Sequence, residues 1–508
     1  MDMHFSPQIL RRRLTLGLSA FALAALTTLA VGQETDLPDI GNPAGTIISI
    51  DDEYRIGLMI MRELRDENLV IEDPEVDEYV QSIGSRIAAQ TPDGNRQFHY
   101  FPVSDPAINA FALPGGFIGV NYGTILASDN ESELAGVLAH ETAHVVQRHI
   151  ARAIQAQSRQ SLTTAAAILA AILIGAAGGG GQAVEGGIAA AEGMAIQQQI
   201  NFTRGEEYEA DRVGMGFLAR AGFDPRGMPD FFEILSRRYG FTEARIPKFL
   251  MDHPVTSDRI AEARGRAAQY ERPKKLVDSA SYALIRERLR VLMASQDTDL
   301  KAYYGKRLET RYPPLSDQYG QALALLQRGH PTEAVEILEP LVAQHEGIIL
   351  LHSALGQAQV ASGQIHDGLT TFEHAESLFP RNVPLTIRYS EALMKAGQAK
   401  LAHTLLLDLF NNVEPTPAEI RMTALAASAA GDTGDAYYYM GEYHISSGNL
   451  PLASQQLQLA LAEPNLTVVQ RERFQARLDE VRDFLASERR AQREQEASNG
   501  GGGRSHMH

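Results

Sequence analysis

Two histidines and a glutamate stand at a spacing that can bind and use a metal ion. They form His140-Glu141-Thr142-Ala143-His144 within the segment ESELAGVLAHETAHVVQRHI. Residues four apart share one face of a helix, so both imidazoles can reach one zinc ion. Glu141 projects toward the edge of that site, where it can take a proton from metal-bound water. A structural histidine pair is the alternative, but unsatisfied polar groups on so apolar a helix would be costly.

A zinc site with two histidines needs a third protein ligand and an open position for water. The chain has no cysteine, so we expect a carboxylate or another histidine. The segment RGEEYEADRVGMG supplies Glu207 and Asp211, four apart and therefore on one helix face. We expect Glu207 to bind the metal and Asp211 to accept the second N–H of a ligand histidine. A solvated acidic face is the alternative, which we expect of Glu206 and Glu209; His149 is expected at the surface or behind a ligand.

HETAH and EYEAD together resemble the gluzincin metallopeptidases that include HtpX and the CAAX prenyl proteases. The resemblance implies one zinc ion per chain, held by His140, His144 and Glu207. It also implies catalytic roles for Glu141, as the base, and for Asp211, as the carboxylate behind a ligand.

Two further segments match this family. DPAINAFALPGGFIGVNYG resembles the strand pair beside the active site, which implies that Asn109, Ala110 and Phe111 form the edge along which substrate lies. DHPVTSDRI resembles the His-Pro segment of the family. It implies that His253 is a candidate inhibitory fourth zinc ligand and that Arg259 lies near the substrate. For His253, a capped loop histidine is the alternative.

The elements that must position these residues form a mixed pattern from Asp51 to Arg272. EYRIGLMIMREL and PEVDEYVQSIGSRIAAQ carry apolar residues at helical spacing, and FHYFPV is typical of a strand. INAFALPGGFIGVNYG predicts two short strands around a Pro-Gly-Gly turn. We therefore predict an α+β zinc metallopeptidase domain over residues 46–272, mostly helical with a small sheet, and a helical linker over 273–316.

The second half of the chain repeats. Gly329, Gly363, Gly397 and Gly431 lie at intervals of 34 residues, each after an apolar helical stretch. A helix–turn–helix period of 34 is typical of tetratricopeptide repeats, whose stacked pairs form a solenoid with a concave binding surface. We predict such an all-α domain over residues 317–487, an irregular helical domain being the alternative.

The two ends of the chain differ from its body. Three arginines and the apolar run LTLGLSAFALAALTTLA predict a signal peptide over residues 1–32, with a retained membrane anchor as the alternative. Residues 488–508 are predicted to be a disordered tail. The net charge of −17 argues against a general nucleic-acid binder. An exported, acidic, cysteine-free chain fits the bacterial periplasm.

A glycine-rich apolar insert separates the two metal-binding segments. Its apolar run at 165–177 is shorter than a membrane span. We expect residues 162–195 to form a mobile lid or hairpin that could make peripheral contact with a membrane; a transmembrane hairpin and a disordered insert are the alternatives.

Together these features predict a periplasmic zinc-dependent endopeptidase. The resemblance implies that the repeat domain recruits misassembled outer-membrane proteins or the beta-barrel assembly machinery, for quality control and assembly of these barrels. The alternative is a repeat-based chaperone or adaptor whose zinc site is structural or regulatory.

Overall fold

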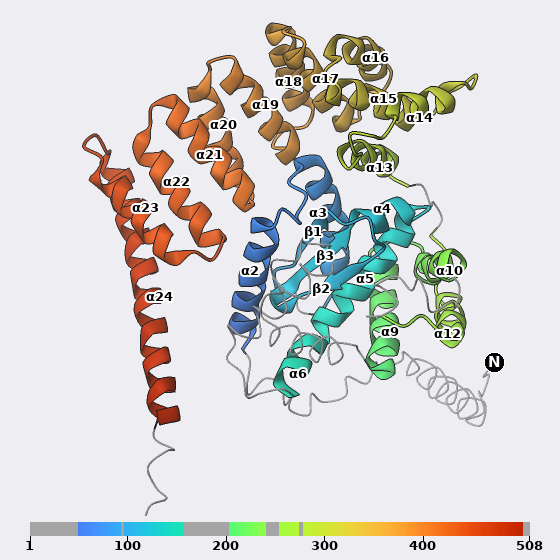
Figure 1. Ribbon diagram of the computed structural model, residues 1–508, viewed down its shortest axis with the longest axis horizontal. Coiled ribbons are helices and arrows are strands. Elements are labelled where there is room, and N and C mark those ends of the chain that lie inside the picture. The colour runs from blue at the N-terminus through green and yellow to red at the C-terminus, as the bar shows by residue number, and fades with distance from the viewer. Residues whose placement is uncertain (1–48, 93–95, 157–202, 240–252, 274–277, 501–508) are drawn as a thin grey trace, which may run out of the picture. The chain divides into compact units, whose positions relative to one another are not determined.

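A computed structural model describes residues 49–92, 96–156, 203–239, 253–273 and 278–500 (Figure 1). The predicted signal peptide, the apolar run at 165–177 and the last eight residues of the predicted tail lie outside these ranges. Among the helices in these ranges, none combines the length and the apolar character needed to cross a membrane.

A three-stranded sheet lies at the centre of the N-terminal region, by which we mean the elements from α2 to α12. Its strands are β1 (His99–Val103), β2 (Ala110–Ala112) and β3 (Phe117–Asn121), in the order β1-β3-β2. β1 runs parallel to β3, with His99 beside Phe117, and β2 runs antiparallel, with Ala110 beside Val120. β2 is therefore one edge of the sheet and β1 the other.

The turn between β2 and β3 explains the Pro-Gly-Gly sequence. Its 3-10 helix η2 (Pro114–Gly116) places Gly115 at φ 81° and Gly116 at φ 94°, which favours glycine. A β-carbon on Gly115 would also lie 2.5 Å from the Cα of Tyr54 in helix α2 (Ile50–Asp66). The turn is thus fixed against the first helix.

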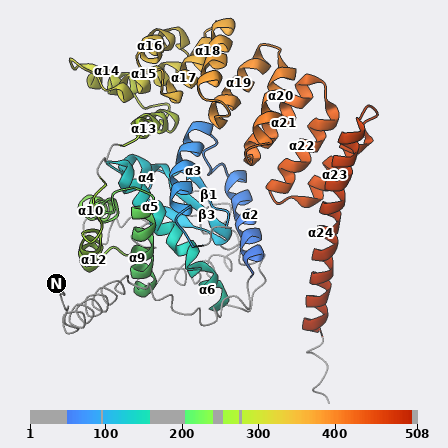
Figure 2. The ribbon, with the colours of Figure 1, turned by 180° about the vertical axis from the view of Figure 1, so that it is seen from behind.

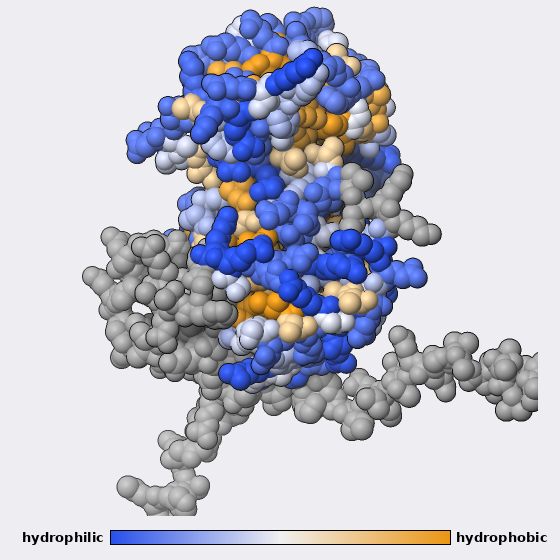
Figure 3. All heavy atoms as spheres, turned by 90° about the vertical axis from the view of Figure 1, so that its right-hand side faces the viewer, coloured by the Kyte–Doolittle hydropathy of each residue, from blue (hydrophilic) through white to orange (hydrophobic). Residues whose placement is uncertain are grey.

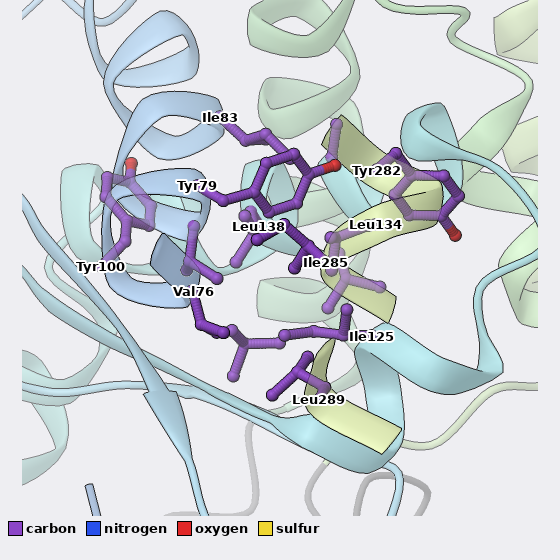
Figure 4. Packing of buried hydrophobic residues seen from close by; sticks show 14 of the residues in the cluster. Val76, Tyr79, Ile83, Tyr100, Ile125, Leu134, Leu138, Tyr282, Ile285 and Leu289 are labelled. Carbon is purple, nitrogen blue, oxygen red and sulfur yellow. The ribbon is translucent and has the colours of Figure 1, made fainter. Parts of the chain in front are cut away.

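Helix α5 (Glu131–Val146) runs beside the sheet and is buried along almost its whole length. Its N-cap is Asn130, whose side chain accepts a hydrogen bond from the backbone N–H of Glu133. Leu134 and Leu138 join a core with Val76 and Ile83 of helix α3 (Pro74–Ala88) and Ile125 of helix α4 (Tyr122–Ala127), shown in Figure 4. This burial accounts for the apolar residues around HETAH.

Helix α9 (Arg204–Arg220) crosses α5 closely because Gly214, which has no side chain, lies at the contact. A β-carbon on Gly214 would lie 2.7 Å from the carbonyl oxygen of Ala139. The remaining helices of the N-terminal region are α6 (His149–Ala156), α10 (Gly227–Tyr239) and α12 (Ser257–Ala267). Close approach of α9 to α5 brings EYEAD to HETAH.

Helices α13 (Ala280–Leu292) and α14 (Leu300–Leu308) lead into the repeat region, which we define as α15 to α24. Its helices pack in antiparallel succession, as Figures 1 and 2 show. They are α15 (Leu315–Gln327), α16 (Pro331–Gln344), α17 (Ile349–Ala361), α18 (Ile365–Leu378), α19 (Val383–Lys395), α20 (Ala399–Phe410), α21 (Pro417–Ala430), α22 (Thr433–Ser446), α23 (Leu450–Ala462) and α24 (Val468–Gly500). Helix α24 continues through residues 488–500, which the sequence assigned to the tail.

The glycines of the 34-residue period end alternate helices. Gly329, Gly363, Gly397 and Gly431 all have φ between 76° and 87°, the left-handed conformation of a helix C-terminus. A small residue then allows close packing, since a β-carbon on Gly368 would lie 2.6 Å from Val360. The predicted fold class, an α+β domain with a small sheet followed by an all-α repeat solenoid, is confirmed.

A buried group of charges joins the repeat region to helix α3. Glu75 of α3 accepts hydrogen bonds from Arg388 of α19 at 2.8 Å and from Ser353 of α17 at 2.6 Å. Arg288 of α13 binds both Asp73, the N-cap of α3, and Glu75. The face shown in Figure 3 is mostly hydrophilic, with separate apolar patches.

Candidate metal centre

The two histidines of HETAH point to one place on helix α5. The Nε2 atoms of His140 and His144 lie 3.0 Å apart, and both side chains are at most 1% exposed. This is the arrangement predicted from their spacing of four residues. Burial lowers the pKa of His144 well below its usual value, so this imidazole is neutral and has a lone pair for a metal.

Glu207 of α9 and His253, which precedes α12, complete the group. Glu207 Oε1 lies 3.4 Å from His144 Nε2, and Glu207 Oε2 lies 3.6 Å from His140 Nε2. His253 Nδ1 lies 2.9 Å from Glu207 Oε1 and 3.3 Å from His140 Nε2. One donor atom from each of the four residues lies within 4.8 Å of the other three.

These separations fit a zinc ion. Bonds of about 2.0–2.1 Å to four tetrahedral ligands place the ligand atoms about 3.3 Å apart, close to the distances from 2.9 to 3.6 Å found here. Burial acts to raise the pKa of Glu207, but the three histidines outweigh it and hold the pKa well below the usual value. One carboxylate and three imidazoles therefore form a donor set that suits zinc.

Asp211 lies behind His140, as the sequence predicted. Its Oδ1 is 2.9 Å from His140 Nδ1, on the side of the ring away from the other ligands. Burial acts to raise the pKa of Asp211, but Arg259 and His140 outweigh it, so the carboxyl is ionised. A carboxylate at this position fixes the proton on Nδ1 and leaves Nε2 for the metal.

Arg259 contacts these carboxylates. Its Nε and Nη2 donate to the two oxygens of Asp211 at 2.7 and 2.8 Å, and its Nη1 lies 2.6 Å from Glu207 Oε2. The side chain is 2% exposed. The structure therefore gives Arg259 a positioning contact, while the substrate contact implied by the family resemblance stays a prediction.

His149 lies behind His144 and contacts its outer ring nitrogen, as Asp211 does for His140. Its Nδ1 lies 2.9 Å from His144 Nδ1, and its Nε2 lies 3.4 Å from Glu209 Oε2. His149 is fully buried, and burial lowers its pKa. Of the two places expected for it, the structure selects the one behind a ligand. Glu209, expected to be solvated, contacts His149 and so joins this series of side chains, and no spacing in the sequence indicated it.

Glu141 is the one charged residue of HETAH outside the ligand group. Both of its carboxylate oxygens are buried, and among the described residues only the backbone N–H of Ala112 in β2 acts on them as a donor, outside strict hydrogen-bond geometry. Oε1 lies 3.6 Å from His253 Nε2. Burial raises the pKa of Glu141 and the neighbouring histidines only partly offset this, which suits a group that must accept and return a proton near neutral pH.

The segment expected to bind substrate lies next to α5. Ala110 and Phe111 belong to β2, which pairs only with β3 among the described strands and packs beside α5. Asn109 is held in place because its N–H donates to Thr124 Oγ1 at 2.8 Å and its carbonyl accepts from Asn121 N–H at 3.0 Å. A strand edge thus runs past Glu141.

Comparison with known proteins places these features in context. The model of peptidase family M48 matches residues 74–267. The crystal structure of a thermophilic TPR protein in Thermus thermophilus covers 38% of this chain and 92% of its own, with 20% identity and a TM-score of 0.23.

Full-length relatives share both regions. A Vibrio cholerae protein is 35% identical over 477 residues, 92% of this chain and 96% of its own length. The beta-barrel assembly-enhancing protease of Escherichia coli K12 is 31% identical over 486 residues, 93% of this chain and 98% of its own. The likeness therefore extends from the peptidase match through the repeats.

Proposed function

The chain belongs to peptidase family M48 and, within it, to the beta-barrel assembly-enhancing proteases, and we propose that it hydrolyses peptide bonds at the group around His140. It is a zinc metallopeptidase. In our proposal His140, His144 and Glu207 hold the zinc ion and Glu141 is the catalytic base. The observation that carries this proposal is the convergence of these buried side chains from α5 and α9.

Each residue then has a defined task. Zinc, when bound, polarises a scissile carbonyl and lowers the pKa of a water molecule. Glu141 accepts the proton of that water and delivers it to the leaving amine, which its raised pKa favours. Asp211 and His149 hold the outer nitrogens of His140 and His144, so each ring keeps Nε2 toward the ligand group. The edge of β2 binds an extended peptide through main-chain hydrogen bonds.

His253 gives the site a resting state in this proposal. Its Nδ1 belongs to the ligand group and its Nε2 faces Glu141, so it occupies the space that water and substrate need. It lies in the short stretch before α12, whereas the other ligands lie on long helices. Movement of this stretch would open the site, and activity would be gated.

We further propose that the chain acts in the periplasm on outer-membrane beta-barrel proteins. The name of the E. coli relative, whose alignment covers 93% of this chain at 31% identity, and the predicted signal peptide support this role. The repeat region would recruit misassembled barrels or their assembly machinery, and residues 165–177 would make any peripheral membrane contact. The alternative function, a repeat-based chaperone or adaptor whose zinc site is structural or regulatory, is favoured by the repeat region and by the presence of His253 in the ligand group.

Replacing Glu141 with Gln tests the catalytic proposal. The variant should keep its zinc, because Glu141 is not a ligand, and lose casein cleavage. Glu336→Gln removes a carboxylate exposed on α16 and should leave both unchanged. Undiminished cleavage by Glu141→Gln would exclude the assigned base. Rescue of an outer-membrane assembly defect by this inactive variant would establish the chaperone function as separate.

A further inference from the structure

A second concave site lies between the N-terminal region and the repeat region. It is a cavity of about 800 Å3. One wall comes from α2, α3 and β1, and the other from α19, α21, α22, α24 and the connection that precedes α21. Since β1 and β2 are opposite edges of the sheet, this cavity is separate from the strand edge beside Glu141.

Aromatic rings form part of the cavity wall. The rings of Tyr54 and Phe117 stack with centroids 5.4 Å apart, and His99 stacks on Phe117 at 4.8 Å. His99 Nε2 is buried without a hydrogen-bond partner among the described residues. Burial lowers the pKa of His99, so the ring is neutral. Neutral aromatic faces attract cations.

Carboxylates outnumber cations around these rings. The acidic residues of the cavity are Asp77, Glu78, Glu414, Glu419 and Glu442, and its basic residues are Arg65 and Arg477. Arg477 is already engaged, since its Nε and Nη2 donate to the two oxygens of Glu442 at 2.8 and 2.9 Å. The cavity therefore has an excess of negative charge.

Asp77 and Glu78 are the carboxylates with the least compensation. Neither side chain accepts a hydrogen bond from a described residue, although both line the cavity. Burial, together with Glu419 across the cavity, outweighs the attraction of Arg65 and raises the pKa of Asp77 to about 7. A cation beside Asp77 would pair with a carboxyl that is largely withdrawn from water, and the more exposed Glu78 adds to the negative charge there.

The strand that lines the cavity is closed to backbone pairing. Gln81 donates to the carbonyl oxygen of Phe98 at 3.2 Å and accepts from the N–H of Tyr100 at 2.8 Å. Pro102 has no N–H to offer. A polypeptide entering here would therefore insert side chains rather than add a strand.

We propose that this cavity binds lysine or arginine side chains of an extended polypeptide, independently of the metal centre. The cation would lie against the rings of Tyr54 and His99 and pair with Asp77 and Glu78. The volume is within the range of about 300–1,000 Å3 typical of ligand sites, which leaves room for one or two side chains. Because α21 and α22 supply one wall, a bound segment touches the repeats and the N-terminal region together.

The first test measures binding in the Glu141→Gln background, which prevents cleavage. A fluorescent lysine-containing decapeptide and its glutamine analogue are titrated against the full chain by anisotropy. We expect Asp77→Asn with Glu78→Gln to weaken binding of the lysine peptide at least about tenfold, the value of one hydrogen bond between charged groups. Glu336→Gln with Glu339→Gln, on exposed α16, removes the same charge elsewhere and should change the affinity less than twofold.

The second test locates the peptide. The chain has no cysteine, so Ser446→Cys places a single thiol on the cavity wall and Ser377→Cys a single thiol on exposed α18. A lysine peptide whose single cysteine is activated as a 2-thiopyridyl disulfide should exchange with the protein thiol, releasing pyridine-2-thione. This exchange should be at least about tenfold faster with the first variant than with the second, by raised local concentration. Equal rates, equal binding of the two peptides, or full affinity in the Asp77 and Glu78 double variant would each overturn the proposal.

Discussion

Replacement of Arg388 by Met should loosen the junction between the repeat region and helix α3. Arg388 Nη2 lies 2.8 Å from Glu75 Oε2 and 3.0 Å from Asp73 Oδ2. Arg288 binds the same two carboxylates, at 2.8 and 2.7 Å. The four charges balance, and their side chains are between 1% and 14% exposed. Removing Arg388 leaves Asp73 and Glu75 to share the single charge of Arg288, so one buried negative charge is no longer balanced.

The expected cost is about 3 kcal/mol. Breaking one buried ion pair typically costs about 3–5 kcal/mol. The pKa of Glu75 gives a similar figure: burial acts to raise it, but Arg288 and Arg388 outweigh this and lower it from 4.5 to about 2. That difference corresponds to about 3 kcal/mol for the two arginines and Ser353 acting together against burial, so it gives the scale of the whole charge group rather than the share of Arg388. Because the pKa of an acid is lowered, this contribution is complete above about pH 4.5 and is lost as the pH falls through about 2.

Urea unfolding at pH 7 followed by circular dichroism measures the loss, and hydrogen exchange in α3 and α19 shows where it occurs. Arg381→Met is the matched control. Arg381 forms an ion pair with Asp408 at 3.6 Å, and both of these side chains are more than half exposed. It should cost less than about 1 kcal/mol. In the double variant Glu75→Gln with Arg388→Met, the loss should fall well short of the sum of the single losses. Additive losses, or a single-variant loss within error of the control, would refute the pairing.

Three further predictions concern the metal centre and the cavity. Gly214→Ala should weaken zinc binding and lower the free energy of unfolding by about 1–3 kcal/mol, because the new β-carbon would press on Ala139 of α5. The control is Gly205→Ala, in the exposed first turn of α9, which should leave both zinc titration and thermal melting unchanged. His253→Ala should raise basal casein cleavage if His253 covers the site, and unchanged activity with normal zinc content would contradict this. Asp77→Asn should stabilise the protein at pH 8 by about 2 kcal/mol. This is half of the free energy that corresponds to the whole pKa shift, because the carboxyl partly faces the cavity. An acid whose folded pKa is raised to about 7 lowers stability as the pH rises from about 4 to 7, so the variant and wild type should melt alike at pH 4 and differ at pH 8.

Local spacing was sufficient to predict the parts of the site that lie within one helix. His140 and His144 share a face because they are four apart, and Glu207 and Asp211 do so for the same reason. The 34-residue period identified the repeats because a helix that ends in the left-handed conformation favours glycine, and these glycines have φ near 80°.

Contacts between distant segments could not be predicted in this way. Arg388 and Glu75 are 313 residues apart, and no local pattern distinguishes this arginine from exposed ones. Arg259 was assigned to the substrate from its segment alone, whereas its contacts with Asp211 and Glu207 depend on how α12 packs against α9. The position of His149 behind His144 depends on Arg148, whose φ of 54° turns the chain between α5 and α6.

The junction at α3 can be perturbed without changing a residue of the metal centre. Such a perturbation tests whether docking of the repeats influences catalysis. Helix α3 contributes no metal ligand, but Tyr79 on it donates to Glu131 in the first turn of α5 at 2.8 Å. His140 and His144 lie about two and a half and three and a half turns beyond Glu131 on α5. Their rings are held there by Asp211 and His149. Arg388→Met should therefore increase exchange in α3 while zinc affinity stays as in wild type. A parallel loss of zinc affinity would instead mean that docking of the repeats sets the geometry of the catalytic helix, because α3 is the only described element that contacts both α19 and α5 closely.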